Sequence, residues 1–492
     1  MKKQLLGKAV VIFGPMADRI VFAQIVVLGL PTIVYYCIFS NLQPLLPLHL
    51  IIPTLYLLTS ILVIAEATVA GFWPSSKRRH PRVEQSLQPL STASSRIASS
   101  VVAGGRSQHT DSTVPASYGS VPRCSVIVVA YLPNEQGVIL GTLRHLLNNL
   151  ERPEQGLEII LAYNTPTRLP VEADLHRLAA LHPELRLLLV EGSRSKAENL
   201  NAAVQIATGE MTCIIDADHR PIADCLERAW NWLRDGDYDV VQGRNVIRNY
   251  RCNLLTRLVA VEFECLYGIS HPAKSLLVDT AIFGGSNGYW RTSVLRKIRF
   301  RPGMMTEDID ATLRALLAGY RIVHDRNIIS TELAPLDLRS LWAQRKRWDQ
   351  GWGEVSLKYQ WPLWRSDKLN LGQKLYWTCL LCYRVIFQLT ALQVFPMLFG
   401  LVLSGNSTPD SIQTYVLLTT ILTLLSGPYQ TLIALKVRSG MLRAAPAHFL
   451  FYCLALPFYA ALKNTISVVA LYDHIMGRTD WVVTPRGLMS FR

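Results

Sequence analysis

Two long apolar stretches flank a central region in which apolar and polar residues alternate. No Asp, Glu, Lys or Arg occurs in 20–65, and 385–409 and 411–435 are equally free of charge. The first run is long enough for two membrane helices of roughly 20 residues, and each of the others for one. The pattern predicts four membrane spans, near 20–40, 50–70, 385–405 and 411–435.

Basic residues sit where the spans are expected to end. Lys2 and Lys3 precede the first span, 77–79 reads Lys-Arg-Arg, and Lys436 follows the last. Because cytoplasmic loops collect Lys and Arg, the spans are expected to form two hairpins with their basic ends in the cytoplasm. A further apolar stretch, 444–462, would count as a fifth span by hydropathy alone.

The segment 74–121 is rich in Ser, Arg, Pro and Gly, and we expect a flexible basic linker there. From 122 to 335 short apolar runs alternate with helix-length segments, which is typical of a mostly parallel sheet with covering helices. The sequence therefore predicts an α/β catalytic domain combined with an α-helical multi-pass membrane region. The expected strands are Ser125–Tyr131, Leu157–Tyr163, Leu185–Val190 and Met211–Asp216.

The net charge of +14 favours a phosphate-bearing ligand or an anionic membrane face. Nucleic acid is not expected as a partner, because the basic residues lie next to apolar spans. The nine cysteines are scattered, and the Cys379–Cys382 pair has no second pair at zinc spacing. Apolar packing in a reducing compartment is the favoured interpretation.

The expected strand Met211–Asp216 continues into Asp216-Ala217-Asp218. Residues two apart share one face of an extended segment, so both carboxylates can face one site at the carboxyl end of a strand. Two carboxylates suit Mg²⁺ or Mn²⁺, with phosphate oxygens completing the shell. The alternative is a polar turn in which Asp218 caps a helix that starts near Pro221.

Two helix starts carry further candidates. Lys196 stands near the beginning of a helix and could hold a diphosphate, or it could be a solvated lysine. The helix after Thr306 opens with Glu307 and Asp308. Thr306 could cap that helix while both acids complement its dipole, or Asp308 could be a general base aimed into a cleft.

A basic and aromatic helix is expected over Leu341–Tyr359. It contains Gln344-Arg345-Lys346-Arg347-Trp348, and Leu341, Trp348, Trp352 and Val355 share one face. Such a helix next to a span is typical of one lying in the membrane interface. That structural role by itself would account for its tryptophans.

Taken in order, Asp-x-Asp, Thr-Glu-Asp and Gln-x-x-Arg-Trp between two membrane hairpins resemble the membrane-embedded family 2 glycosyltransferases, which include cellulose, curdlan and hyaluronan synthases. The resemblance implies a GT-A catalytic domain that uses a nucleotide sugar and a divalent metal. It implies that Asp216 and Asp218 bind the metal and the diphosphate. Lys196 would bind the nucleotide, and Arg347 would contact the diphosphate. Asp308, beside Glu307, would be the catalytic base. Gln344, Trp348, Gly285 and Ser286 would lie on the acceptor side.

The segment Trp481–Arg486 resembles the gating loop of cellulose synthases, which folds over the bound nucleotide; Thr484 and Arg486 would then contact it. Such a loop must share the cytoplasmic side of the catalytic domain. Both termini are therefore expected in the cytoplasm, with 444–478 forming a kinked re-entrant or interfacial helix. One departure concerns the binding of the uracil base of the nucleotide. The family usually has an Asp after its second strand that contacts the uracil, where this chain has Asn164.

The expected organisation begins with an N-terminal membrane hairpin (1–73), a linker (74–121) and a cytoplasmic GT-A domain (122–335). Interfacial helices (336–384), a C-terminal hairpin (385–443), an interfacial or re-entrant helix (444–478) and a gating-loop-like tail (479–492) are expected to follow. The expected function is processive, inverting synthesis of a β-linked polysaccharide from UDP-glucose or another UDP-hexose at the inner (plasma) membrane, with export of the product. The alternative is a single transfer to a lipid acceptor. A catalytically silent membrane scaffold is disfavoured, and the sequence leaves a second copy or an accessory subunit open.

Overall fold

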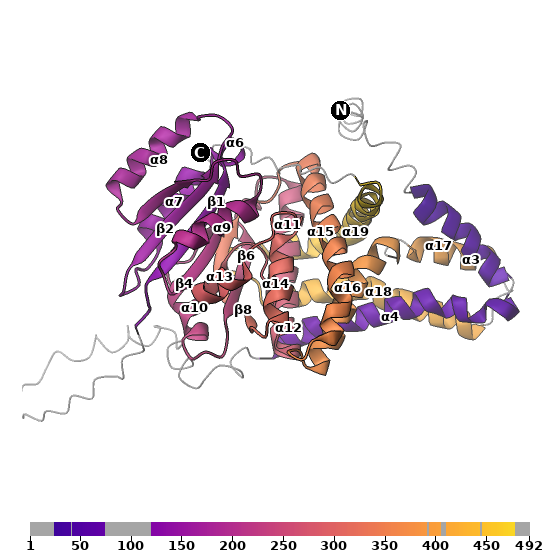
Figure 1. The fold of residues 1–492 in the computed structure, drawn as a ribbon. Coiled ribbons are helices and arrows are strands. Elements are labelled where there is room, and N and C mark those ends of the chain that lie inside the picture. Colours follow the sequence, from indigo (N-terminus) through magenta and orange to yellow (C-terminus); the bar gives the residue numbers. More distant parts are fainter. Residues whose placement is uncertain are drawn as a thin grey trace, which may run out of the picture.

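The computed structural model describes residues 24–40, 42–73, 120–390, 393–404, 410–442 and 445–477. A sheet-containing domain occupies one end of the molecule, and a group of long helices extends from the other (Figure 1). The predicted linker 74–121 lies almost entirely outside the described residues. So does the predicted gating loop with Thr484 and Arg486.

The domain is built on one eight-stranded sheet with the strand order β3-β2-β1-β4-β7-β6-β8-β5. The pairs β1–β2, β1–β4, β2–β3 and β6–β8 are parallel, whereas β7 runs antiparallel to β4 and β6, and β5 antiparallel to β8. This confirms the predicted mostly parallel sheet. The strands are β1 (Cys124–Tyr131), β2 (Leu157–Asn164), β3 (Leu185–Leu189), β4 (Met211–Asp216), β5 (Arg220–Pro221), β6 (Val240–Ile247), β7 (Gly288–Arg291) and β8 (Ile322–Glu332).

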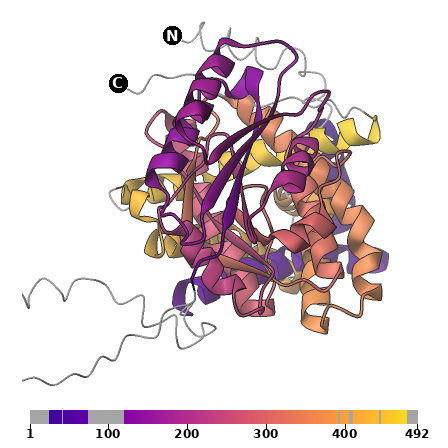
Figure 2. The ribbon, with the colours of Figure 1, turned by 60° about the vertical axis from the view of Figure 1, so that its left-hand side comes forward.

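Helices cover both faces of the sheet (Figure 2). The alternating side chains of β1 divide between two apolar cores: Val126 and Val128 pack in one, and Ile127 and Val129 in the other. Burial on both faces explains why this strand reads as a continuous apolar run. The helices of this domain are α6 (Leu132–Glu135), α7 (Ile139–Asn149), α8 (Pro170–Leu181), α9 (Lys196–Ile206), α10 (Cys225–Leu233), α11 (Leu254–Cys265), the π-helix η6 (Leu266–Ser270), α12 (His271–Val278), α13 (Thr292–Ile298) and α14 (Glu307–Leu317).

Nine helical segments make up the rest of the described chain. They are the π-helix η2 (Ile25–Gly29), α3 (Leu30–Ser40), α4 (Leu42–Phe72), α15 (Leu338–Arg365), α16 (Leu371–Thr390), α17 (Val394–Ser404), α18 (Asp410–Lys436), the 3₁₀ helix η8 (Gly440–Leu442) and α19 (Pro446–Ile475). Among them, Leu50–Phe72, Asp410–Lys436 and Pro446–Ile475 are long and apolar enough to cross a membrane. This fits the predicted spans near 50–70 and 411–435.

Two predicted spans look different in the structure. The charge-free run 385–409 is divided, because α16 continues to Thr390 and an 11-residue helix, α17, starts at Val394. Near 20–40 the described chain forms η2 and the 11-residue α3. Both α3 and α17 are apolar but shorter than the roughly 20 residues that a straight crossing needs.

The segment expected to form a kinked re-entrant or interfacial helix is the helix α19, which runs for 30 residues with Pro457 inside it. Its length and composition are sufficient for a full crossing. The side of the membrane on which the C-terminus lies stays a prediction.

Polar side chains join the long helices α4 and α18, which lie side by side in Figure 1. Ser60 donates to Thr423 (3.1 Å), and hydroxyl pairs join Thr54 to Tyr415 (2.9 Å) and Thr68 to Tyr429 (2.8 Å). In addition, Glu66 of α4 accepts hydrogen bonds from Ser270 and Lys274 at the sheet domain's edge. Hydrogen bonds of this kind hold apolar helices together where the hydrophobic effect between them is weak.

Candidate active site

A cleft of about 740 Å³ opens at the carboxyl ends of β1, β2 and β4. In an open α/β sheet this edge is where ligands bind, because the connections on either side of it diverge. The predicted site residues that line the cleft are Asn164, Lys196, Asp216, Gly285, Ser286, Glu307, Asp308, Gln344, Arg347 and Trp348. The fold therefore gathers into one site residues that are spread over nearly two hundred positions of the chain.

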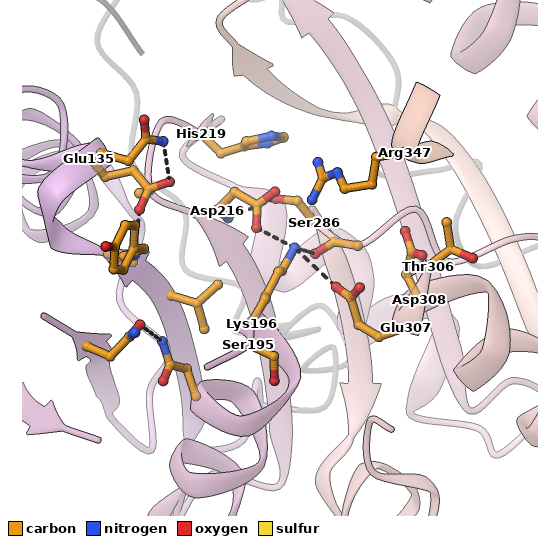
Figure 3. A pocket seen from close by; sticks show the side chains of 18 of the residues that line it. Glu135, Ser195, Lys196, Asp216, His219, Ser286, Thr306, Glu307, Asp308 and Arg347 are labelled. Atoms are coloured by element: carbon orange, nitrogen blue, oxygen red, sulfur yellow. Dashed lines mark hydrogen bonds and ion pairs between the residues drawn. The ribbon is translucent and has the colours of Figure 1, made fainter. Parts of the chain in front are cut away.

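An ion pair at the end of β4 forms the centre of the cleft (Figure 3). The ammonium of Lys196 lies 2.5 Å from Asp216 Oδ1 and 3.9 Å from Glu307 Oε1, and it donates to the carbonyl of Gly285 (2.8 Å). Burial lowers the pKa of Lys196, but the neighbouring carboxylates outweigh burial and leave this pKa above its ordinary value. A permanently charged cation therefore faces the cleft.

The position of Lys196 follows from local sequence. Ser195 is the N-cap of α9, and its hydroxyl accepts a hydrogen bond from the amide of Glu198 (3.2 Å). Lys196 is consequently the first residue of the helix, as the sequence predicts, and it lies where the positive end of the helix dipole favours anions.

Asp218 is placed differently from the expectation. Its side chain is fully buried, its Oδ2 accepts from the amide of Leu333 (3.0 Å), and it is absent from the cleft lining. The alternative role as a helix cap is wrong, because 220–221 forms strand β5 and α10 starts at Cys225 after Asp224. The structure thus brings Asp216, but not Asp218, to the cleft wall.

The start of α14 carries Glu307 and Asp308 into the cleft. Thr306 is the N-cap residue of this helix, as one interpretation of the sequence had it, but its side chain makes no capping hydrogen bond. Burial, and next the charge of Glu307, raise the pKa of Asp308 to about 7. A carboxylate with a pKa near neutrality is suited to accept a proton at physiological pH.

The loop before β7 passes unusually close to these charged groups. Gly285 has φ +81°, and a Cβ at this residue would lie 2.9 Å from Asp308 Oδ2 and 3.4 Å from Lys196 Nζ. Only glycine combines this backbone conformation with so close an approach. The hydroxyl of Ser286 accepts from the Asp216 amide (3.0 Å) and so joins the loop to β4.

The helix α15 supplies the opposite wall through Gln344, Arg347 and Trp348. In Figure 3, Arg347 extends toward the space in front of Asp216 and Ser286. The Oε1 atom of Gln344 is buried and has no hydrogen-bond partner among the described residues. The helix packs against α14, α16 and α19, and its predicted place in a membrane interface stays a prediction.

Asn164, expected near the nucleotide base, lines the cleft at the end of β2. Its amide nitrogen donates to the carbonyl of Ser193 (3.0 Å), and its oxygen accepts from the amide of Asn199 (2.8 Å). Since a carbonyl can only accept, Ser193 fixes the orientation of both amides. Asn164 therefore joins the loop after β3 to helix α9.

Sequence reasoning missed several lining residues. Asn134 and Glu135 follow β1, and Glu135 accepts from the amide of Tyr131 (2.5 Å). The Nε2 atom of His219 lies 3.2 Å, within hydrogen-bond distance, from a carboxylate oxygen of Glu332, which stands at the end of β8. The strand-end rule that singled out Asp216 applies equally to Glu135 and Glu332. Phe263 and Tyr267 also line the cleft, but they come from helices that carried no sequence signal for this site.

The donor atoms at the site are compatible with a substrate-bridged divalent metal. Within the described ranges no three His, Cys, Asp or Glu side chains gather closely enough to hold a metal alone. Asp216 nevertheless presents a carboxylate to the cleft. Mg²⁺ and similar ions commonly bind through one or two carboxylates while substrate phosphates supply the remaining oxygens, and the residues present fit that arrangement.

Residues 211–462, slightly more than half of the chain, match the model of the family described as "Glycosyl transferase family group 2". The chain belongs to this family. It is 26% identical over 260 residues to the poly-β-1,6-N-acetyl-D-glucosamine synthase of Staphylococcus epidermidis, covering 52% of this chain and 61% of that protein. It is 25% identical over 244 residues to the probable glycosyltransferase YdaM of Bacillus subtilis, covering 49% and 57%. The chain thus spans about three fifths of the length of these relatives.

Solved structures give a weaker likeness. The mannosyltransferase PcManGT from Pyrobaculum calidifontis, in complex with GDP-Man and Mn²⁺, has 22% identity and a TM-score of 0.45, covering 73% of this chain and 88% of that one. Staphylococcus aureus TarS 1–349 has 15% identity and a TM-score of 0.40, covering 72% and 92%.

Proposed function

We propose that this chain is a processive, inverting glycosyltransferase, and that it extends a β-linked polysaccharide from a UDP-sugar donor. One observation carries the proposal: Asp308 and the Lys196–Asp216 pair meet at Gly285, so a proton acceptor stands beside a cation suited to a diphosphate. Proton removal and diphosphate binding are the two functions that sugar transfer from a nucleotide donor requires. The motif order and the relatives named as polysaccharide synthases support a polymeric product.

The donor's diphosphate is proposed to lie between Lys196 and Arg347, which approach it from α9 and α15. We expect Asp216 to face a Mg²⁺ or Mn²⁺ ion shared with the diphosphate oxygens. That ion would stabilise the negative charge of the departing diphosphate. Asp218, bound to the Leu333 amide, would support this turn from behind. Asn164 would lie near the base, and Thr484 and Arg486 would close over the nucleotide.

In the proposed reaction the acceptor sugar lies against Trp348 and Gln344, with Gly285 and Ser286 beside it. Its hydroxyl attacks C1 of the donor sugar on the face opposite the diphosphate, and Asp308 takes the hydroxyl proton. The bond between C1 and the diphosphate oxygen breaks, and the nucleotide diphosphate leaves. Attack from the opposite face converts an α-linked donor into a β-linked product. The raised pKa of Asp308 makes this carboxylate a better base than an exposed aspartate.

We further propose that the catalytic domain faces the cytoplasm of a multi-pass plasma-membrane protein that exports its product. The three membrane-length helices and the basic residues near their ends support this orientation. A second copy of the chain or an accessory subunit could complete an export path.

A labelled-donor panel tests the function. Purified full-length protein is incubated with labelled UDP-N-acetylglucosamine, UDP-glucose and GDP-mannose, and products are separated into precipitable polymer and lipid extract. We expect polymer from one UDP-sugar, sensitive to a β-specific glycosidase and absent with Asp308→Asn. UDP-N-acetylglucosamine comes first because the product named for the S. epidermidis relative is built from that sugar. Label found only in the lipid extract would instead support single transfer to a lipid.

Metal binding is tested separately from turnover, by titrating Mn²⁺ into protein and UDP and following the spin-resonance signal of free Mn²⁺. Asp216→Asn should weaken UDP-dependent Mn²⁺ binding at least tenfold, since a direct ligand is lost. Asp218→Asn should weaken it less. The reverse order would restore Asp218 as the principal ligand.

A further inference from the structure

Three aromatic rings and one guanidinium group follow one another along one wall of the cleft, and the planes of the first two rings are tilted by 37°. The ring centroids of Phe263 and Tyr267 are 5.7 Å apart, and the guanidinium carbon of Arg345 lies 5.8 Å from the Phe263 centroid and 4.3 Å from that of Trp348. Phe263, Tyr267 and Trp348 line the cleft, whereas Arg345 is buried between two of the rings. We call these four residues the stacked wall.

Helix geometry fixes the positions of Phe263 and Tyr267 in the stacked wall. Phe263 and Tyr267 are four residues apart at the junction of α11 and the π-helix η6, so their rings lie on the same face. Tyr267 is also packed on His271, with 4.7 Å between ring centroids. These two rings are therefore held by their own helix and its continuation.

The positions of Arg345 and Trp348 in the stacked wall depend on hydrogen bonds and ion pairs outside the cleft, centred on Glu262, which we call the charged clamp. Arg345 donates to Glu262 (2.8 Å), which also accepts from Tyr459 (2.7 Å) and Lys463 (2.9 Å) of α19. Glu262 is thus the carboxylate shared by two cations, one of them inserted between the wall's rings. Removing one partner of such a buried pair leaves an uncompensated charge, so the cation would have to move.

With the acceptor sugar lying against Trp348, as proposed above, we propose that Glu262 positions the rings that meet the C–H face of this sugar by holding Arg345 between Phe263 and Trp348. Aromatic rings supply large, flat apolar surfaces of the kind such a sugar face can cover. The guanidinium suits the gap because it is planar and stacks on rings. This inference rests on the proposed function, since it needs a sugar acceptor.

Because Tyr459 and Lys463 belong to α19, the same clamp links this membrane-length helix to the acceptor side. Two more polar contacts join α15 to α19: an ion pair between Lys346 and Asp473, and a hydrogen bond from Ser467 to Asp349 (2.5 Å). A displacement of α19 would therefore be transmitted to the stacked wall. Glu262 itself is a positioning residue, because it is not part of the cleft lining.

The test uses full-length protein in lipid nanodiscs, UDP-N-acetylglucosamine as donor and a β-1,6-linked N-acetylglucosamine tetramer as acceptor. Nucleotide release is measured with and without the tetramer, which separates acceptor use from donor hydrolysis. We expect Glu262→Gln to raise the acceptor KM about tenfold, while the donor KM and the rate of donor hydrolysis change less than twofold. Glu262→Asp should restore part of the loss.

The matched control is Glu264→Gln, the same substitution two residues along α11. Glu264 is buried in an ion pair with Arg244 and accepts from Ser439, away from the cleft lining. It should lower the unfolding temperature without raising the acceptor KM. If Glu262→Gln does not fold, Arg345→Lys keeps the charge but loses the planar stack, and the same rise in acceptor KM is expected.

The outcomes separate the two proposals. Absence of nucleotide release by the wild-type protein with every UDP-sugar of the panel would overturn the proposed function. Nucleotide release with an acceptor KM that is unchanged in both Glu262→Gln and Arg345→Lys would overturn the stacked wall alone. Equal rises of the donor and acceptor KM would also overturn it, because the clamp would then serve the whole cleft.

Discussion

The two sides of the cleft are built in different ways. On the proposed donor side, single polar residues stand at the ends of strands or at the first turn of a helix, as Asp216 and Lys196 do. On the proposed acceptor side, rings from α11, η6 and α15 contact an ion cluster that reaches α19. The donor side is therefore positioned by backbone geometry, whereas the acceptor side depends on packing between helices distant in sequence.

This difference predicts how substitutions on each side of the cleft affect the neighbouring residues. A substitution on the donor side should remove one chemical group and leave its neighbours in place, because the sheet holds them. A substitution behind the acceptor side should displace rings that it does not itself touch. The following predictions, from the largest effect to the smallest, test this contrast.

Asp308→Asn should produce the largest loss. The variant keeps the shape of the side chain but cannot accept a proton, so turnover should fall by roughly 10²–10⁴. UDP binding, measured by calorimetry, should stay within about threefold of the wild-type value, because the Lys196–Asp216 pair is intact. If UDP binding falls as far as turnover does, Asp308 belongs to the donor site and not to the proton transfer.

Gly285→Ala should lower turnover by about 10², since small displacements of reacting groups cost this much. The new Cβ would collide with Asp308 Oδ2 and approach Lys196, in a backbone conformation with φ +81°. Gly236→Ala is the matched control, because Gly236 has φ +78° but nothing within 4 Å of a Cβ. Comparing kcat of both variants separates backbone strain from crowding; equal losses would contradict the crowding argument.

The pH dependence follows from the raised pKa of Asp308, which burial and then the charge of Glu307 bring to about 7. Below that pH the carboxylate is protonated and cannot act as a base. The acid limb of kcat/KM should therefore fall about tenfold per pH unit below roughly 7, and not near 4 as for an exposed aspartate. A profile that stays flat down to pH 5 would remove Asp308 from the role of base.

Losing a helix cap should give the smallest effect, on either side of the cleft. Ser195 caps α9 and Asn253 caps α11, each accepting an amide hydrogen bond. Replacing either by Ala should cost about 1 kcal/mol of unfolding free energy. Ser195→Ala should raise mainly the donor KM, because Lys196 follows it, and Asn253→Ala mainly the acceptor KM. The opposite assignment would contradict the contrast between the two sides.

Four of the eight strands, and most residues of the proposed donor side, could be predicted from the amino-acid sequence. The apolar runs that predicted four strands correspond to β1, β2, β3 and β4, with bounds that differ by at most one residue. Because β1, β2 and β4 are buried on both faces, they read as continuous apolar stretches. Strand-end and helix-start rules likewise found Asp216, Lys196 and Asp308, since such positions are set by local backbone geometry.

Other features of the fold and of the cleft depend on contacts between segments that are distant in the sequence. The tertiary structure turned Asp218 toward the Leu333 amide, although alternation along the chain gave it the same direction as Asp216. It also divided 385–409 between α16 and α17, and brought Glu262, Arg345 and Lys463 together from positions about two hundred residues apart. Contacts between helices depend on which faces meet, and no local pattern encodes that choice.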